Sequence, residues 1–405
     1  MRCTWACMRI TEALRFALLL ALALSAGRVH AQAADTGQPP RIGVVTMGPG
    51  DVFWERFGHD AIVVDDPARG EPISYNFGFF DLAEDGFIGR FVRGEMQYRL
   101  VALPLDDDMQ YYREVGRGAS LQWLAVEPAQ ARQLAADLAE NAKPENARYR
   151  YDYFTDNCAT RVRDALDRAL GGNLRRQMEP RSSGDSYRSE SVRLASPEPW
   201  MWLLFDVGLG PYGDRPLSRW EQAFLPRRLA DDVRDAKLPD GRPLVVAEQQ
   251  LLPQRQPAEP DERPRHAWPW LALGLALAAS ILACARRAPR LLGGVGLGFW
   301  LLCGAVGLVL LLGWGFTAHR ALWANRNLLL FNPLCLLLLP GGWALLRGHA
   351  GSGRFRSLLV AVAALAAVAL LPLWLQAMPQ RNGPWIALLL PVHAAFAWCR
   401  GRRKP

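Results

Sequence analysis

The spacing of apolar residues divides the chain into two parts. Up to about residue 265, short apolar runs alternate with polar and turn-forming stretches, whereas five long apolar stretches dominate the rest. Each approaches the ~20 residues that a helix needs to cross the hydrocarbon core of a bilayer. They lie near 267–285, 291–316, 327–346, 357–376 and 384–399. The pattern predicts an all-α membrane domain of five transmembrane helices over 267–400, followed by a cytoplasmic tail over 401–405.

The polar half has the alternation of an α+β domain. Runs rich in β-branched residues predict strands at 41–47, 59–65, 72–77 and 118–126, and the turn-rich stretch between the second and third predicts an antiparallel hairpin. Helices are expected at 128–142 and 158–170, the second capped by Asp156 or Asn157. We therefore expect an antiparallel sheet with helices over 32–252. A linker rich in proline and charge, over 253–266, joins it to the membrane domain.

The first 31 residues have the features of a secretory signal peptide. Arginines precede an apolar run over 16–26 that is too short to span a bilayer, and Ala31 ends a segment that resembles a cleavage site. Cleavage there would leave Gln32 as the mature N-terminus, and the alternative is an uncleaved anchor. Either way, the domain that follows is expected outside the cytoplasm.

Charge is distributed as unevenly as hydrophobicity. The chain has a formal charge of +8, but residues 266–405 hold 13 basic residues and no Asp or Glu. The signal segment carries +3, so residues 32–265 carry −8. Nucleic-acid binding requires a basic face, and we therefore expect no nucleic-acid partner.

Basic residues also orient the predicted spans. With the N-terminal domain outside, the cytoplasmic segments hold ten Arg and Lys residues, and the outer loops hold three. This asymmetry agrees with the positive-inside rule. The sequence thus predicts a multi-pass protein of the inner (cytoplasmic) membrane with its N-terminal domain in the periplasm.

The outer loop between the second and third spans is unusually polar. Its polar residues are His319, Arg320, Asn325, Arg326 and Asn327. Two interpretations are open: a loop that anchors at the membrane interface, or a patch that faces lipid headgroups or substrate. In the second interpretation, Arg326 is the candidate substrate-binding residue.

The N-terminal domain contains one cysteine and one histidine, both in chemically useful positions. Cys158 lies in the first turn of a predicted helix, where unpaired N–H groups and the helix dipole stabilise a thiolate or an oxyanion. His59 begins a predicted strand. The pair suggests a nucleophile with its general base, and the alternative is that both residues are structural.

Other chemistries fit the domain less well. One cysteine and one histidine provide too few soft ligands for a closed zinc site, so we expect no metal and no other cofactor. A serine cluster over 182–191 has no Gly-x-Ser-x-Gly elbow and reads as a polar loop.

Four sequence words carry a family resemblance. They are Phe57-Gly58-His59-Asp60-Ala61, Tyr75-Asn76-Phe77-Gly78, Tyr151-Asp152-Tyr153-Phe154-Thr155-Asp156-Asn157-Cys158-Ala159-Thr160-Arg161 and Trp220-Glu221-Gln222-Ala223-Phe224-Leu225-Pro226. With the order of domains, they resemble the Lnb-type lipoprotein N-acyltransferases. A histidine strand that precedes an Asn-Cys helix also resembles circularly permuted papain-like enzymes, such as the lecithin–retinol acyltransferase group.

The resemblance implies a permuted papain-like domain that performs a two-step acyl transfer. Cys158 would attack a phospholipid ester and form a thioester, while His59 protonates the departing lysophospholipid. The acceptor would be the N-terminal amine of a diacylglyceryl-cysteine lipoprotein. The implied partners are therefore a phospholipid donor, a bacterial lipoprotein and the inner membrane.

The resemblance also suggests supporting residues. Asn76, on the strand after His59, is the expected orienting residue, and Tyr75, Asp60 and Glu55 are alternatives. Tyr75 and Asn157 are further candidates for substrate binding.

Two other functions stay open at this stage. A thiol phospholipase, or a cell-wall amidase or peptidase of the same fold, would use the same pair and transfer the acyl group to water. A non-enzymatic envelope scaffold or sensor would use neither residue chemically.

Overall fold

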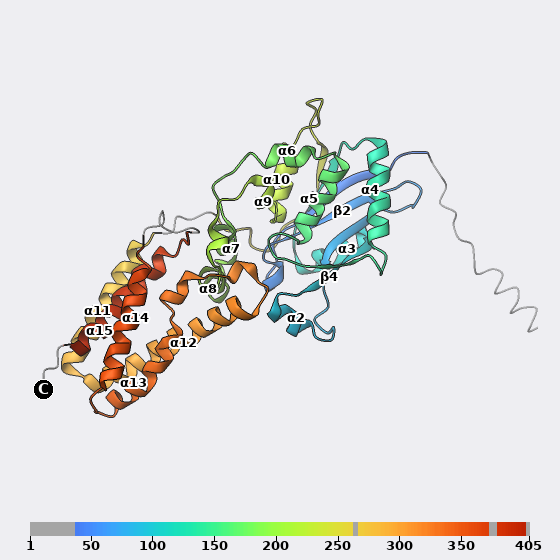
Figure 1. Ribbon diagram of the computed structural model, residues 1–405. Coiled ribbons are helices and arrows are strands. Elements are labelled where there is room, and N and C mark those ends of the chain that lie inside the picture. The colour runs from blue at the N-terminus through green and yellow to red at the C-terminus, as the bar shows by residue number, and fades with distance from the viewer. Residues whose placement is uncertain (1–36, 262–265, 372–378, 402–405) are drawn as a thin grey trace, which may run out of the picture.

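The structure is a computed structural model that describes residues 37–261, 266–371 and 379–401. The predicted signal peptide and residues 402–405 of the predicted tail lie outside the described residues. Figure 1 shows a mixed α/β part at the N-terminal end and a bundle of helices at the C-terminal end, with short helices between them. The N-terminal part is α+β, as the sequence predicts.

A seven-stranded sheet forms the centre of the N-terminal part. Its order is β6-β4-β3-β2-β1-β5-β7, and all neighbouring strands are antiparallel. The strands are β1 (Arg41–Met47), β2 (His59–Asp65), β3 (Ile73–Phe79), β4 (Gln97–Pro104), β5 (Ala119–Leu124), β6 (Arg148–Arg150) and β7 (Val245–Leu252). The four predicted strands correspond to β1, β2, β3 and β5, and the predicted hairpin is the β2–β3 pair.

Helices cover both faces of the sheet. They are α2 (Phe87–Arg93), α3 (Leu105–Val115), α4 (Pro128–Asn141) and α5 (Cys158–Ala169). Successive residues of a strand point to opposite faces, so Val44 of β1 packs in the core shared with α4 and α5, whereas Val45 packs in the core shared with α3. The predicted helices correspond to α4 and α5.

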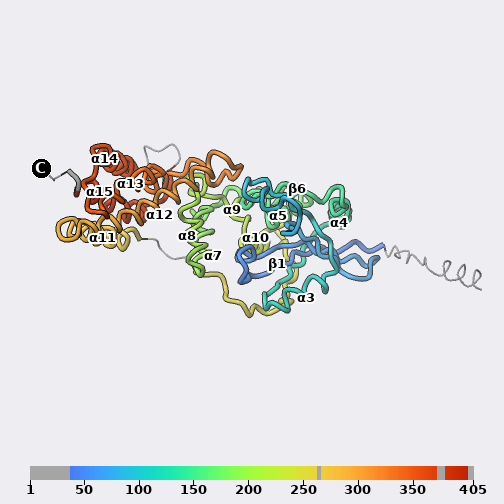
Figure 2. The backbone as a smooth tube through the Cα atoms, turned by 90° about the horizontal axis from the view of Figure 1, so that it is seen from below, coloured from blue at the N-terminus to red at the C-terminus, as the bar shows by residue number. Residues whose placement is uncertain are grey.

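A group of short helices follows and leads toward the membrane part. They are α6 (Asn173–Met178), α7 (Tyr187–Ala195), α8 (Pro199–Gly208), α9 (Arg219–Gln222) and α10 (Pro226–Asp235). Figure 2 shows α7 and α8 between the sheet and the membrane helices.

The membrane part differs from five unbroken spans. Its helices are α11 (Trp268–Arg287), α12 (Pro289–Phe316), α13 (Leu339–Leu346), α14 (Gly353–Val368) and α15 (Gly383–Gly401). Among the described residues, only α11 and α12 are long and apolar enough to cross a membrane alone. The predicted third span is a bent pair, Arg320–Leu329 and Pro333–Leu346, with an angle of 42° between the halves.

A physical cause for the bend lies at its vertex. Pro333 cannot donate a backbone hydrogen bond and therefore interrupts a regular helix at this position. By length and composition, the described part of the chain thus contains two candidate spans, or three if the bent pair counts as one. The predicted span over 357–376 runs into residues 372–378, which lie outside the described residues.

Candidate functional site

His59 is the first residue of β2, and its half-buried imidazole is held from β3. The preceding Gly58 has a φ of 78°, a conformation that glycine adopts without a steric penalty. Nε2 of His59 lies 3.0 Å from Oδ1 of Asn76. Because an amide oxygen only accepts hydrogen bonds, Nε2 carries the proton, and Nδ1 is the basic nitrogen of the neutral ring.

A buried carboxylate fixes the orientation of the Asn76 amide. Nδ2 of Asn76 donates to Oδ2 of Asp108 and to Oγ of Ser74, both at 2.9 Å. The Ser74 hydroxyl donates to the same Asp108 oxygen at 2.6 Å. An ionised carboxylate only accepts, so the amide nitrogen faces Asp108 and the amide oxygen faces His59.

Asp108 is a site residue that sequence reasoning missed. It belongs to three consecutive aspartates that open α3, and such a run is typical of a solvated helix start. Asp106 and Asp107 are exposed, and only Asp108 is buried. The apolar spacing of α3, in which Leu105, Met109 and Tyr112 face the core, was the signal that places Asp108 on the inner face.

Cys158 opens α5 behind a complete cap. The Asn157 side chain accepts from the backbone N–H of Thr160 at 2.9 Å, and the Thr160 hydroxyl accepts from the backbone N–H of Asn157 at 2.7 Å. The Asn157 amide nitrogen donates to the carbonyls of Tyr153 and Phe224. Asn157 therefore uses its amide to hold the helix start, and a substrate contact by this residue stays a prediction.

The thiol of Cys158 lies where β2 and β3 separate. The described β2–β3 register ends at the pair of Ala61 and Asn76, and β3 shifts its register with β4 just beyond. Backbone N–H groups of Asp60 and of the helix start act on the thiol and lower its pKa. A Cβ atom added to Gly78 would lie 3.7 Å from the Cβ of Cys158.

Cys158 and His59 lie near the same end of β2: His59 is its first residue, and Cys158 lies beside Asp60, its second. Through Asn76 and Asp108, His59 belongs to the face covered by α3, whereas Cys158 packs against the core on the α5 face. Asp60, whose charge raises the pKa of the thiol, directly follows His59.

Burial determines the protonation of both groups. It raises the pKa of the Cys158 thiol to about 12, assisted by the charge of Asp60, although N–H groups of Asp60 and of the helix start act in the opposite direction. It also lowers the pKa of His59, despite the nearby Asp108. The expectation that the helix end makes this sulfur anionic is therefore wrong for this state, because desolvation outweighs the N–H donors.

Asp60 is a second buried carboxyl beside the thiol. Its Oδ1 accepts from the Thr46 hydroxyl at 2.7 Å, whereas Oδ2 has no hydrogen-bond partner among the described residues. Burial raises the pKa of Asp60 to about 7. The charge beside Cys158 therefore changes near neutral pH.

Aromatic rings connect this region to the membrane part. Tyr151 stacks on Tyr98 with ring centroids 4.2 Å apart and packs edge-on against Tyr153 at 5.7 Å. Tyr153 in turn stacks on His319 of the outer loop at 6.0 Å. The Tyr149 hydroxyl, which would lie 3.8 Å from a Cβ on Gly78, has no hydrogen-bond partner in the described part of the chain.

The remaining predicted residues lie elsewhere. Tyr75 is buried in the core on the α5 face, and the structure gives no support to a substrate contact there. Glu55 accepts from the Tyr111 hydroxyl at 2.5 Å and pairs with Arg117 at 3.3 Å, so its carboxylate is already engaged.

Within the described ranges, no group of three His, Cys, Asp or Glu side chains is placed to hold a metal ion.

Comparison with known protein families shows which family the chain belongs to. Residues 31–191 match the Lnb N-terminal periplasmic domain, and residues 263–404 match the Lnb transmembrane domain. The chain belongs to the Lnb family. The predicted resemblance is therefore confirmed, and the N-terminal domain is periplasmic. No curated protein and no solved structure gave a match.

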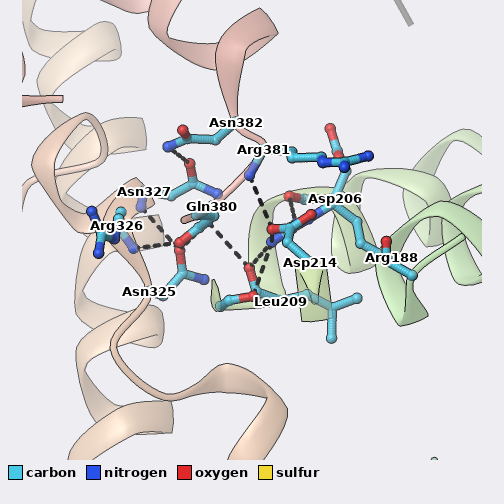
Figure 3. Close-up of polar contacts among 12 residues, drawn as sticks. Arg188, Asp206, Leu209, Asp214, Asn325, Arg326, Asn327, Gln380, Arg381 and Asn382 are labelled. Carbon is cyan, nitrogen blue, oxygen red and sulfur yellow. Dashed lines mark hydrogen bonds and ion pairs between the residues drawn. The ribbon is translucent and has the colours of Figure 1, made fainter. Parts of the chain in front are cut away.

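The Lnb membrane part holds the periplasmic part through the polar outer loop (Figure 3). The last carbonyls of a helix lack intrahelical donors. At the end of α8, the amide of Asn325 donates to the carbonyls of Val207 and Gly208, and that of Asn327 donates to Val207. Gln380 donates to the carbonyl of Leu209 at 3.3 Å.

This loop therefore has a role that neither sequence interpretation included. The backbone N–H of Arg381 donates to Asp214, and the Trp385 indole donates to Asp206 at 2.7 Å. Asp214 also forms a buried ion pair with Arg188 at 2.9 Å. The asparagines of the loop dock the two parts of the Lnb chain onto each other.

Arg326 differs from its neighbours in the same loop. Its backbone N–H donates to Gln380 at 2.8 Å, but its guanidinium forms no ion pair with any described residue. Substrate binding by Arg326 stays a prediction.

Proposed function

We propose that this Lnb protein is a thiol acyltransferase that moves a fatty acyl chain from a phospholipid, through a Cys158 thioester, to the N-terminal amine of a diacylglyceryl-cysteine lipoprotein. Family membership supports the reaction class. One structural observation supports the assignment of residues: Cys158 lies beside Asp60, which directly follows His59, and the imidazole of His59 is held by Asn76 and Asp108.

In the first step, the protonation states require a coupled proton transfer. A thiol with a pKa of about 12 is not nucleophilic by itself, so Nδ1 of His59 takes its proton as Sγ attacks the ester carbonyl. The tetrahedral intermediate collapses, the C–O bond breaks, and the lysophospholipid oxygen takes the proton from His59. The enzyme is left as the Cys158 thioester.

The second step reverses these roles. The neutral lipoprotein amine attacks the thioester carbonyl and gives a proton to His59, and the C–S bond breaks. Sγ then recovers the proton, and an amide has formed. Backbone N–H groups at the start of α5, which act on the thiol, would also stabilise the developing oxyanion. The Tyr149 hydroxyl, which has no hydrogen-bond partner among the described residues, lies beside the same space.

The relay explains how a neutral imidazole serves as the base. Asp108 holds Asn76, and Asn76 holds the Nε2–H of His59, so Nδ1 keeps its lone pair. In a circularly permuted papain-like domain, the histidine strand, the strand with the orienting residue and the cysteine helix would follow one another in this same order along the chain.

Transfer is distinguished from hydrolysis by supplying or withholding the acceptor. We expect full-length protein in phospholipid vesicles to convert a diacylglyceryl lipopeptide to the triacylated form, with one lysophospholipid per product, by mass spectrometry. Cys158→Ala should abolish both products. Release of free fatty acid at the same rate without lipopeptide would instead identify a phospholipase.

A further inference from the structure

Large apolar side chains are exposed along one side of α2. Ile88 and Val92 lie one helical turn apart and are 62% and 59% exposed, whereas Phe87 and Phe91 pack toward the core. Residues four apart share one face of a helix. Two apolar residues therefore form a stripe that the protein itself does not cover.

Helix α8 carries a second exposed stripe. Trp200 and Leu204 are 56% and 54% exposed, and Leu203 beside them is also exposed. Trp202 instead stacks on Trp270 of α11 and lies against Trp385 of α15, with ring centroids 6.0 and 6.3 Å apart. One side of α8 thus packs against the membrane bundle, while the apolar side chains on another side are exposed.

The outer end of the bundle fixes both helices. The carbonyl of Arg93, at the end of α2, accepts from the N–H of Ala318 at 2.7 Å, and His319 bonds to the carbonyl of Phe91 at 2.9 Å. The end of α8 is held by Asn325. Figure 1 shows α2 and α8 on the side of the domain that faces the outer end of α12.

The segment that leads to His59 bridges the two stripes. Trp54 packs edge-on against Phe80, which precedes α2, and Phe53 lies against Trp200 of α8, both with centroids 5.7 Å apart. Trp54 is itself exposed. The apolar surface is therefore continuous from α2 to α8, through the segment that precedes His59.

The surface also continues onto the lipid-facing surface of the bundle. At the outer end of α12, Trp314 and Phe316 are exposed. The cations of the outer loops, Arg320, Arg326 and Arg381, have no acidic neighbours in sequence, because residues 266–405 contain no Asp or Glu. Aromatic and basic residues together are typical of the interfacial zone of a bilayer.

We propose that α2, α8 and the segment 52–54 are embedded in the outer leaflet of the membrane, so that the periplasmic domain lies against the bilayer. The occupant of this apolar surface is lipid, because the surface is continuous with a bundle that lipid must surround. The contact does not depend on the acyl-transfer chemistry. It does mean that an acyl chain can approach His59 and Cys158 without leaving the bilayer.

Photolabelling of the full chain tests this contact. The protein is placed in nanodiscs whose phosphatidylglycerol and phosphatidylethanolamine carry a diazirine on the acyl chain, and adducts are mapped by peptide mass spectrometry after illumination. We expect adducts on residues 87–93 and 199–208 as well as on the spans. Val246 of β7, which is 65% exposed, is the matched control and should remain unlabelled.

Two variants complete the design. Cys158→Ala should give the same labelling pattern, because the contact belongs to the surface and not to catalysis. Ile88→Glu with Val92→Glu should lose the adducts on α2 and keep those on the spans. Adducts confined to the spans of the wild-type protein, or equal labelling around Val246, would overturn the proposal, whether or not acyl transfer is observed.

Discussion

The Nε2–H of His59 donates to the amide oxygen of Asn76 over 3.0 Å, and this bond leaves Nδ1 as the basic atom of the imidazole. The orientation of the bond depends on Asp108, which holds the other end of the Asn76 amide at 2.9 Å. A carboxylate two hydrogen bonds away thus determines which nitrogen can accept a proton. The tests of the site begin with this residue.

Asp108→Asn should lower acyl transfer and move its pH dependence. An amide at this position can donate as well as accept, so Asn76 is no longer held in one orientation. The negative charge of Asp108 raises the pKa of His59, and its removal should move the acidic limb of the rate profile to lower pH. Complete loss of the base, in His59→Ala, should cost about 10²- to 10⁴-fold.

Asp107→Asn is the control for that variant. Asp107 lies on the same turn of α3 and is exposed. The Asp107→Asn variant should leave the rate of acyl transfer and its pH profile unchanged. Equal effects of the two substitutions would show that the helix start, and not the relay, is responsible.

Asp60→Asn should make Cys158 more reactive above neutral pH. The charge of Asp60 raises the pKa of the thiol, and the variant removes that charge. Because the pKa of Asp60 is about 7, the wild-type residue is largely neutral at lower pH, and the difference should shrink there. The rate of iodoacetamide alkylation of the Cys158 peptide, measured by mass spectrometry across pH, reports this directly.

The same variant should change how stability depends on pH. The folded pKa of Asp60, about 7, lies above its ordinary value of 3.8, so the folded state holds a proton that the unfolded state releases. This contribution is present at low pH and is lost as pH rises from about 4 through 7. Relative to wild type, Asp60→Asn should therefore gain thermal stability as pH rises. Asp65→Asn, at the other end of β2, should show neither effect.

Gly78→Ala should reduce both stability and activity. Gly78 has a φ of 98°, which costs an L-residue about 1–2 kcal/mol, and its new Cβ would enter the space between Cys158 and Tyr149. Gly70→Ala is the matched control, because Gly70 has a φ of 83° and nothing within 4 Å of the added Cβ. If both variants retain full activity, the space beside Gly78 is not part of the site.

Asn325→Ala should weaken the attachment of the periplasmic domain to the bundle. It removes the donors to the carbonyls of Val207 and Gly208. Val207 keeps the donor from Asn327, whereas the Gly208 carbonyl is left without a partner, which costs about 1–3 kcal/mol. The thermal midpoint should fall, and hydrogen exchange in α8 should rise. Arg326→Ala keeps the backbone contact to Gln380 and should leave both unchanged, while a higher KM for phospholipid would support the predicted substrate contact.

Much of the fold was accessible from the sequence because local patterns determine it. The β-branched runs at β1 and β2 and the Asn157 cap of α5 are local signals, and the structure agrees with them. The bend at Pro333 was not predicted from hydropathy, which measures apolar length and not backbone continuity. Helix α2 was also missed, since its seven residues are too few for a clear period.

From the sequence, the site could be predicted only for residue types that occur once in the domain. A single cysteine and a single histidine attract attention by their number, whereas Asp108 is one acidic residue among many and gains its meaning from burial beside Asn76. The high pKa of Cys158 likewise depends on burial, which helix position alone does not reveal. The docking role of Asn325 required contacts across more than 100 residues of sequence.

The most direct test of the central claim is the intact mass of the purified protein after incubation with phospholipid and no acceptor. We predict a mass increase of one acyl chain, located on the Cys158 peptide, removed by neutral hydroxylamine and absent in Cys158→Ala. An unmodified Cys158 in a preparation that still produces triacylated lipopeptide on addition of acceptor would contradict the acyl-enzyme mechanism.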